Sequence, residues 1–101
     1  MAPFEVNRSN DEMTLVVRGS LDINSAPALA EEIDKIVATR PSKVVVDLSM
    51  LDLIDSSGVA ALLSLYKRVR ANGGEVRFVG VKAQPLVVFK LLRLDRAFSL
   101  S

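Results

Sequence analysis

The chain has 101 residues, a length that predicts one small domain spanning residues 1–101. Thirteen basic and twelve acidic side chains leave a net charge of +1, which argues against a nucleic-acid binder because such proteins gather a basic surplus on one face. Cysteine and histidine are both absent, which removes disulfides, zinc–thiolate sites and the commonest general base, so we expect no cofactor, no metal site and no enzymatic activity.

The N-terminal segment predicts a β-hairpin. Residues 4–8 alternate between apolar and polar side chains, which is typical of a short strand with one buried face. Residues 13–18 are rich in β-branched side chains and predict a second strand. The polar residues 9–12 between them form the expected turn.

A first helix is expected after the turn at residues 19–22. Asn24 or Ser25 is placed to cap this helix, and Pro27 suits its first turn. Its apolar residues fall on one helical face; they are Leu29, Ile33, Ile36 and Val37. The helix ends before Pro41.

The second half of the chain predicts further alternation of strands and helices. Residues 43–48 form a nearly unbroken apolar run, typical of a central strand covered on both faces. A second helix is expected from about 57 to 71, with an apolar stripe at Val59, Leu62, Leu63, Tyr66 and Val69. Residues 75–80 predict another strand, 84–94 favour a helix, and Phe98-Ser99-Leu100 is a candidate last strand.

This order of elements predicts a small α/β domain. Helices that connect successive strands imply a mostly parallel sheet, and the opening hairpin adds an antiparallel strand at its edge. We therefore expect a mixed, mostly parallel sheet with an N-terminal β-hairpin and helices packed on it.

The segment 52–59 stands out as a candidate site. It lies between the apolar strand and the second helix, so Ser56, Ser57 and Gly58 fall at a helix N-terminus. Backbone N–H groups lack partners there and the helix dipole is positive, so an anion or a phosphate is stabilised. The alternative is purely structural, because Asp55 or Ser56 is also a good helix cap.

Other chemistries fit the sequence poorly. A phosphoryl-accepting acidic pocket would need acidic residues directly after the first strand, where Asn7-Arg8-Ser9 stands instead, so Asp22, Asp47, Asp52 and Asp55 are better explained as turn and cap residues. Neither a nucleophile elbow nor a glycine-rich phosphate loop is present. The basic residues Lys67, Arg68 and Arg70 suit the end of a helix and a solvated face.

The chain resembles the STAS domain family, and specifically the stand-alone bacterial anti-sigma factor antagonists. Four segments in the same order carry this resemblance: Gly19-Ser20-Leu21-Asp22, Val44-Val45-Val46-Asp47-Leu48, Leu53-Ile54-Asp55-Ser56-Ser57-Gly58-Val59 and Asn72-Gly73-Gly74-Glu75-Val76. Members of the family often carry a further helix after the last strand, whereas this sequence ends at Ser101.

The resemblance implies a phosphorylation switch. In that family, an anti-sigma factor that is itself a serine kinase phosphorylates the serine directly after the aspartate, which is Ser56 here. The unphosphorylated protein captures the anti-sigma factor and so releases the sigma factor, and a serine phosphatase restores capture. Two related roles stay open: a subunit of a lipid-transport ABC complex, and a stressosome-type scaffold.

Loops that leave the C-terminal ends of parallel strands gather at one edge of a sheet. We therefore expect a partner-binding surface there, made of Asp22, Asn24, Asp55, Ser56, Ser57 and Gly58. No apolar run reaches the roughly 18 residues of a membrane span, and the first ten residues have no apolar signal core. We expect a cytoplasmic protein that is not inserted in a membrane.

Overall fold

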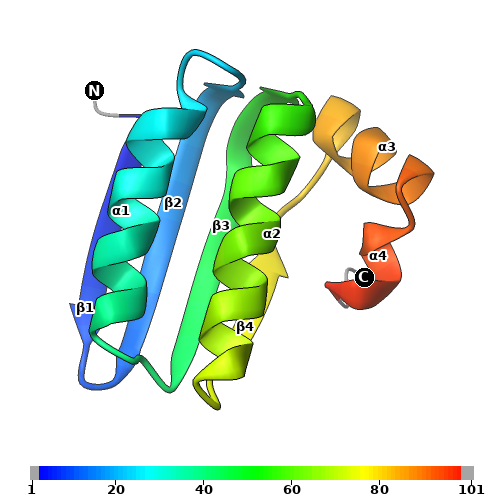
Figure 1. The fold of residues 1–101 in the computed structure, drawn as a ribbon. Helices are drawn as coiled ribbons and strands as arrows, with labels where there is room; N and C mark the ends of the chain where they lie inside the picture. The colour runs from blue at the N-terminus through cyan, green and yellow to red at the C-terminus, as the bar shows by residue number, and fades with distance from the viewer. Residues whose placement is uncertain (1–2, 99–101) are drawn as a thin grey trace.

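The computed structural model of the chain describes residues 3–98, and within them four strands and four helices alternate (Figure 1). The strands are β1 (Phe4–Ser9), β2 (Glu12–Leu21), β3 (Lys43–Ile54) and β4 (Glu75–Val79). The helices are α1 (Ala26–Ala38), α2 (Ser56–Ala71), α3 (Ala83–Leu91) and α4 (Leu94–Ala97).

The sheet is mixed, with the strand order β1-β2-β3-β4. β1 pairs with β2 in antiparallel fashion, and β2, β3 and β4 are parallel to one another. The predicted fold class, a mostly parallel sheet that begins with a hairpin, is confirmed.

Helices α1 and α2 lie side by side on one face of the sheet (Figure 1). The predicted apolar stripe of α1 is buried there at Leu29, Ile33 and Ile36. In α2 the buried stripe includes Leu65, which the sequence analysis did not single out, whereas Tyr66 is only half-buried. Tyr66 lies on the flank toward α4, where its hydroxyl donates a hydrogen bond to the carbonyl oxygen of Ala97 at 2.9 Å.

The second face of β3 is not covered as predicted. Val44, Val46 and Leu48 are buried beneath the helices, but the alternate residues Val45 and Asp47 are only half-buried. The described helices lie on the opposite face or beside the β4 edge, so the apolar run reflects one closed face and one partly open face (Figure 1).

Strands β2 and β3 are longer than expected and end at Leu21 and Ile54. β3 also continues past its neighbour, because its pairing with β4 stops where Asp47 faces Val79. This extension brings the chain to the edge where α2 begins.

The C-terminal part also differs from the prediction. The expected helix over 84–94 is interrupted at Arg93, whose φ of 59° lies in the left-handed region and separates α3 from α4. Phe98 ends α4 instead of opening a strand, because its N–H donates to the carbonyl oxygen of Leu94. Its ring is buried against Phe78, with centroids 4.1 Å apart, whereas Ser99 and Leu100 lie outside the described residues.

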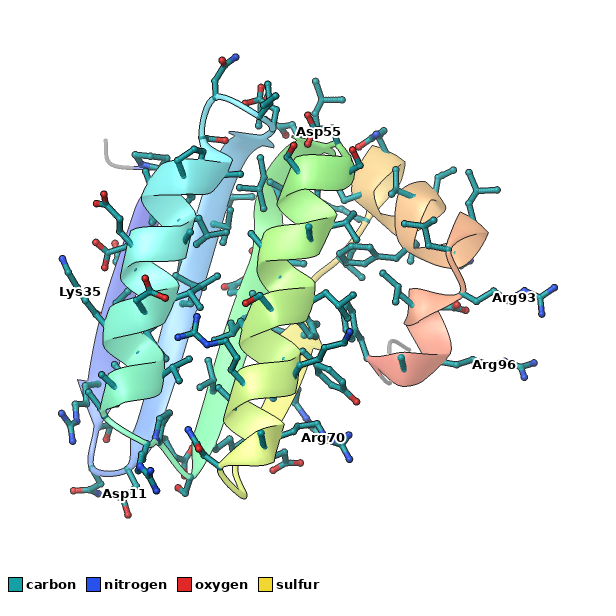
Figure 2. All side chains as sticks on the ribbon, in the orientation of Figure 1. Asp11, Lys35, Asp55, Arg70, Arg93 and Arg96 are labelled. Carbon is teal, nitrogen blue, oxygen red and sulfur yellow. The ribbon has the colours of Figure 1, made fainter. Side chains whose placement is uncertain are left out.

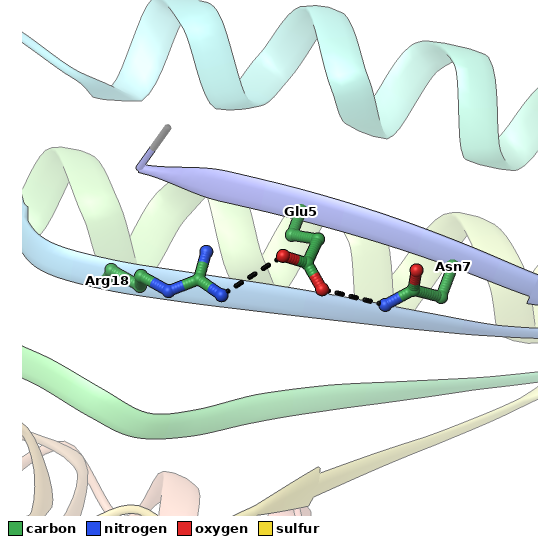
Figure 3. Close-up of polar contacts among 3 residues, drawn as sticks. All are labelled: Glu5, Asn7 and Arg18. Atoms are coloured by element: carbon green, nitrogen blue, oxygen red, sulfur yellow. Dashed lines mark hydrogen bonds and ion pairs between the residues drawn. The ribbon is translucent and has the colours of Figure 1, made fainter. Parts of the chain in front are cut away.

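A polar network crosses the hairpin on the open face of the sheet (Figure 3). Arg18 donates to one oxygen of the Glu5 carboxylate at 3.1 Å, and the Asn7 amide donates to the other at 3.0 Å. The hydrogen bond from Asn7 and then the contact with Arg18 lower the pKa of the Glu5 carboxyl below its ordinary value.

We predict that Asn7→Ala raises the pKa of Glu5 toward its ordinary value, because the largest contribution to its lowering is lost. A lowered carboxyl pKa stabilises the fold above the pKa of the unfolded chain, and this contribution disappears as the pH falls through the folded pKa. An NMR titration of the Glu5 carboxyl carbon measures the change. Ser9→Ala, on the same strand, is the control and should leave the curve unchanged; an unchanged curve in Asn7→Ala would contradict the prediction.

Candidate functional site

The candidate site lies where β2 and β3 end at the same edge of the sheet. The loop after β2 carries Asp22, and the residue after β3 is Asp55. A shallow pocket of about 260 Å³ is shared by these two segments and the first turn of α3; its lining residues are Ser20, Leu21, Asp22, Leu53, Ile54, Asp55 and Gln84. The sheet therefore brings together Asp22 and Asp55, as expected from the sequence.

Asp55 joins the two loops and caps α2 (Figure 2). Its Oδ1 accepts a hydrogen bond from the N–H of Gly58 at 3.1 Å, the usual bond of an N-cap residue. Its Oδ2 accepts from the N–H of Ile23 at 3.1 Å, and its own N–H donates to the carbonyl oxygen of Leu21. One carboxylate thus fixes the start of α2 and the loop after β2 relative to each other.

Gly58 allows α2 to approach β2 closely. A Cβ atom at this position would lie 2.6 Å from the carbonyl oxygen of Leu21 and 2.8 Å from the Cγ1 of Ile54. Both distances are below van der Waals contact, so a larger residue would push the helix away from the strands. Gly58 is buried, so the structure gives it a packing role beneath the surface.

Ser56 and Ser57 differ in exposure. Ser56, the first residue of α2, is exposed, whereas Ser57 is half-buried. Within residues 3–98 neither hydroxyl has a hydrogen-bonding partner, because Asp55 provides the cap. Of the two structural readings of the sequence, capping by Asp55 is therefore confirmed, and it leaves the Ser56 hydroxyl unengaged at the surface.

The loop after β2 is held by a local turn. The Asp22 carboxylate accepts hydrogen bonds from the N–H groups of Asn24 at 2.9 Å and Ser25 at 3.2 Å. Ser25 occupies the N-cap position of α1, but its hydroxyl bonds backwards to Ser20 and Asp22 instead of capping the helix. Asn24 is exposed and belongs to the same edge as Ser56.

Gln84 of α3 is a contributor that the sequence analysis missed. Its Oε1 accepts from the N–H of Ile54 at 2.9 Å, and its Nε2 donates to the carbonyl oxygen of Ile54 at 3.0 Å. β3 continues beyond the end of its pairing with β4, and there the Gln84 amide forms the backbone hydrogen bonds that a neighbouring strand would otherwise form. No periodicity or motif signals such a contact, because it depends on the tertiary placement of α3.

Exposed apolar residues of α3 and its C-cap were also missed. Leu91 and Leu92 are more than half exposed, and with Val88, Ile54, Asp55 and Ser56 they line a groove of about 280 Å³ between α2 and α3. The sequence predicts these leucines as part of a helical run and does not indicate which face they occupy.

The described part of the chain contains neither a cluster of metal-binding side chains nor a helix that could span a membrane. Among residues 3–98, no three acidic side chains gather in a way that would hold a metal ion. No helix in that same range is both long and apolar enough to cross a membrane.

The signature segment, its cap and the sheet order agree with one known family, whose model, the STAS domain, matches residues 3–101. The chain belongs to the STAS domain family.

The chain is similar to three further proteins of known name or structure. The anti-sigma-F factor antagonist RsfB of Mycobacterium tuberculosis is 33% identical over 94 residues, which cover 90% of this chain and 74% of RsfB. The crystal structure of an anti-sigma factor antagonist from Mycobacterium paratuberculosis superimposes with a TM-score of 0.81 at 27% identity, covering 94% and 80% of the two chains. SpoIIAA of Bacillus in its phosphorylated form shares the fold, with a TM-score of 0.76 at 18% identity over 92% and 86%.

We predict that Asp55→Ala lowers the free energy of unfolding by about 2 kcal/mol, because it removes the cap of α2 and the bond to the loop after β2. Chemical denaturation measures the change. Asp52→Ala is the matched control, since the Asp52 side chain is exposed and makes no hydrogen bond or ion pair within the described residues. Equal stability of the two variants would contradict the bridging role of Asp55.

We predict that Gly58→Ala destabilises the fold by about 2 kcal/mol or more, because the added methyl group meets backbone and side-chain atoms below contact distance. Ala is otherwise favoured over Gly inside a helix, so a purely helical effect would have the opposite sign. Thermal unfolding of Gly58→Ala beside Ser57→Ala distinguishes the two effects, and a stabilised Gly58→Ala would show that α2 moves away without cost.

Proposed function

We propose that this STAS domain is an anti-sigma factor antagonist and that Ser56 is its phosphorylation site. The observation that carries the proposal is the exposed, unengaged hydroxyl of Ser56 beside the capping Asp55. The 33% identity to RsfB over 90% of the chain supports the choice of function within the family. The partner is an anti-sigma factor with serine kinase activity, and a serine phosphatase reverses the modification in the cytoplasm.

The position of Ser56 lets the fold accept a phosphate. The N–H groups of Ser56 and Ser57 lie in the first turn of α2, where the helix itself supplies no acceptor. A phosphate adds about −1.5 to −2 charges, and the positive end of the helix dipole offsets part of this charge. The domain therefore stays folded after modification.

The same charge prevents capture. The unmodified surface around Ser56 is a mostly apolar groove, and a partner that packs on it removes water from the serine. Burying a phosphate in such an interface has a high desolvation cost unless cations are provided for it. Phosphorylation thus changes the affinity for the partner and leaves the domain's own core intact.

The residues of the expected binding surface have two kinds of role: some can touch a partner directly, and others hold the surface in shape. Ser56 and Asn24 are exposed and able to touch a partner directly, with Ser57 and Asp22 half-buried beside them. Asp55 and Gly58 hold the loops and α2 in place. We expect no turnover by the isolated domain, because its part in the switch is to be bound and modified.

We predict that Ser56→Ala captures the anti-sigma factor normally but resists phosphorylation, because only the acceptor hydroxyl is lost. Ser56→Asp should fold normally and bind at least tenfold more weakly, since it adds about one negative charge at a helix start that tolerates it. Incubation with the purified kinase, ATP and magnesium, followed by intact-mass and peptide analysis, locates the phosphate.

Ser57→Ala is the matched control and should gain one phosphate like the wild type. A phosphate on Ser57, or full capture by Ser56→Asp, would overturn the assignment. Co-purification of the unmodified chain with an ABC-type ATPase would instead favour the transport role, and assembly into a large homogeneous complex would favour the scaffold role.

A further inference from the structure

The peptide unit that joins Ile54 to Asp55 is hydrogen-bonded at both of its polar groups. Its carbonyl oxygen, which belongs to Ile54, accepts from the Nε2 of Gln84 at 3.0 Å. Its N–H, which belongs to Asp55, donates to the carbonyl oxygen of Leu21 at 3.1 Å. Gln84 also accepts the N–H of Ile54 through its Oε1 at 2.9 Å. We call the two hydrogen bonds between Gln84 and Ile54 the Gln84 clamp.

The clamp acts on the backbone that leads directly to Ser56. Ile54 is buried, whereas Ser56, two residues later, is exposed. The carboxylate of Asp55, which lies between them, is bonded to the N–H groups of Gly58 and Ile23. The chain is therefore held on every side up to the residue whose hydroxyl faces the solvent, and the contribution of α3 to this support is the clamp.

The turn that leads into α3 is strained. Ala83, the first residue of α3, has a φ of 54°, in the left-handed region that a residue with a Cβ atom rarely adopts. Gln84 follows it directly, so ordinary helical angles at Ala83 would redirect the helix and move the amide away from Ile54. Such strain persists only where the surrounding structure holds it, and it concentrates at functional sites.

Apolar packing holds α3 at few points. Of its nine residues, all within the described range, two are buried, Pro85 and Phe89. Its N-cap residue, Lys82, makes no side-chain cap bond. The clamp is thus the polar link between α3 and the end of β3, and it keeps α3 beside the start of α2 (Figure 1).

We propose that Gln84 is a positioning residue for the phosphorylation of Ser56 and acts through the backbone of Ile54 and Asp55. The proposal rests on the function proposed above, because it concerns the reactivity of the acceptor named there. In that reaction the Ser56 oxygen forms a bond to the γ-phosphorus of ATP, the bond to the leaving ADP breaks, and the hydroxyl proton passes to a base of the kinase.

Position matters in this reaction because the attacking and leaving oxygens must lie nearly in line across the phosphorus. A misplacement of about 1 Å is enough to lower the rate of such a step about a hundredfold. Gln84 does not contact the Ser56 hydroxyl; it fixes the strand end from which this hydroxyl is presented.

A purely structural role is the alternative, because buried peptide groups need hydrogen-bonding partners. Such a role predicts that loss of the Gln84 clamp lowers stability and leaves the reactivity of Ser56 in the folded protein unchanged. The two roles are separated by measuring phosphoryl transfer at a temperature well below the unfolding transition of every variant.

The test compares Gln84→Met with Lys90→Met. Gln84→Met keeps the length of the side chain and removes both groups that bond to Ile54. Lys90 is exposed on the same helix and makes no side-chain hydrogen bond or ion pair within the described residues, so Lys90→Met is the matched control. The probe is each purified anti-sigma factor kinase of the organism that carries this chain, with ATP and magnesium, and peptide analysis locates the phosphate.

We expect Gln84→Met to lower the single-turnover rate constant of transfer to Ser56 at least fivefold at saturating kinase. The kinase concentration that gives half of this rate should change less than twofold, because Gln84 acts on the acceptor and not on the affinity. Lys90→Met should match the wild type. Gln84→Glu keeps an acceptor for the N–H of Ile54 but loses the donor to its carbonyl oxygen, so its rate constant should be intermediate; it also replaces Gln84→Met if that variant does not fold.

Hydrogen exchange measures the Gln84 clamp without a kinase. The amide of Ile54 should exchange at least tenfold faster in Gln84→Met, because its acceptor is lost, and at the wild-type rate in Lys90→Met.

The outcomes separate this proposal from the proposed function. A wild-type rate of transfer in Gln84→Met, with faster exchange at Ile54, would overturn the positioning role and leave the function standing. Unchanged exchange at Ile54 would overturn the clamp on which the proposal depends. Failure of every such kinase to modify the wild type on Ser56 would overturn the function, and the positioning role with it.

Discussion

The organisation of the site depends on one carboxylate. Asp55 accepts the N–H of Gly58 at the start of α2 and the N–H of Ile23 in the loop after β2. These two segments are far apart in the sequence, and the bridge holds them in register with the end of β3. Because Asp55 caps α2, the hydroxyl of Ser56 is not needed as a cap. Ser56 is exposed, so its hydroxyl is accessible to another protein.

The length of β3 determines where the Asp55 carboxylate lies. β3 continues beyond its pairing with β4, so the chain reaches the sheet edge at Ile54 and turns directly into α2. The peptide groups of the buried Ile54 in this extension are hydrogen-bonded by the Gln84 amide of α3. Buried peptide groups need such partners, and here the partner also brings α3, with its exposed leucines, beside the helix start.

Much of the architecture follows from local patterns in the sequence. Alternation in the hairpin, the stripe of α1 and the helix start after Asp55 all depend on near neighbours, and the structure agrees with them. Predictions that depended on distant packing were less successful. Three features depend on how distant elements pack and not on neighbouring residues. They are the open face of β3, the break at Arg93 and the position of Phe98. The Gln84 contact and the groove have the same origin, since both require α3 to dock beside β3.

The bridge formed by Asp55 and the close approach at Gly58 have a consequence for how such signatures are interpreted. Two of the four residues in Asp55-Ser56-Ser57-Gly58 are required by the geometry of the backbone, whatever partner the domain meets. In this chain the aspartate and the glycine keep these structural roles whether or not Ser56 is modified. Those two positions therefore reflect how α2 packs against its strands, and the exposed Ser56 between them is the position on which the proposed regulation depends.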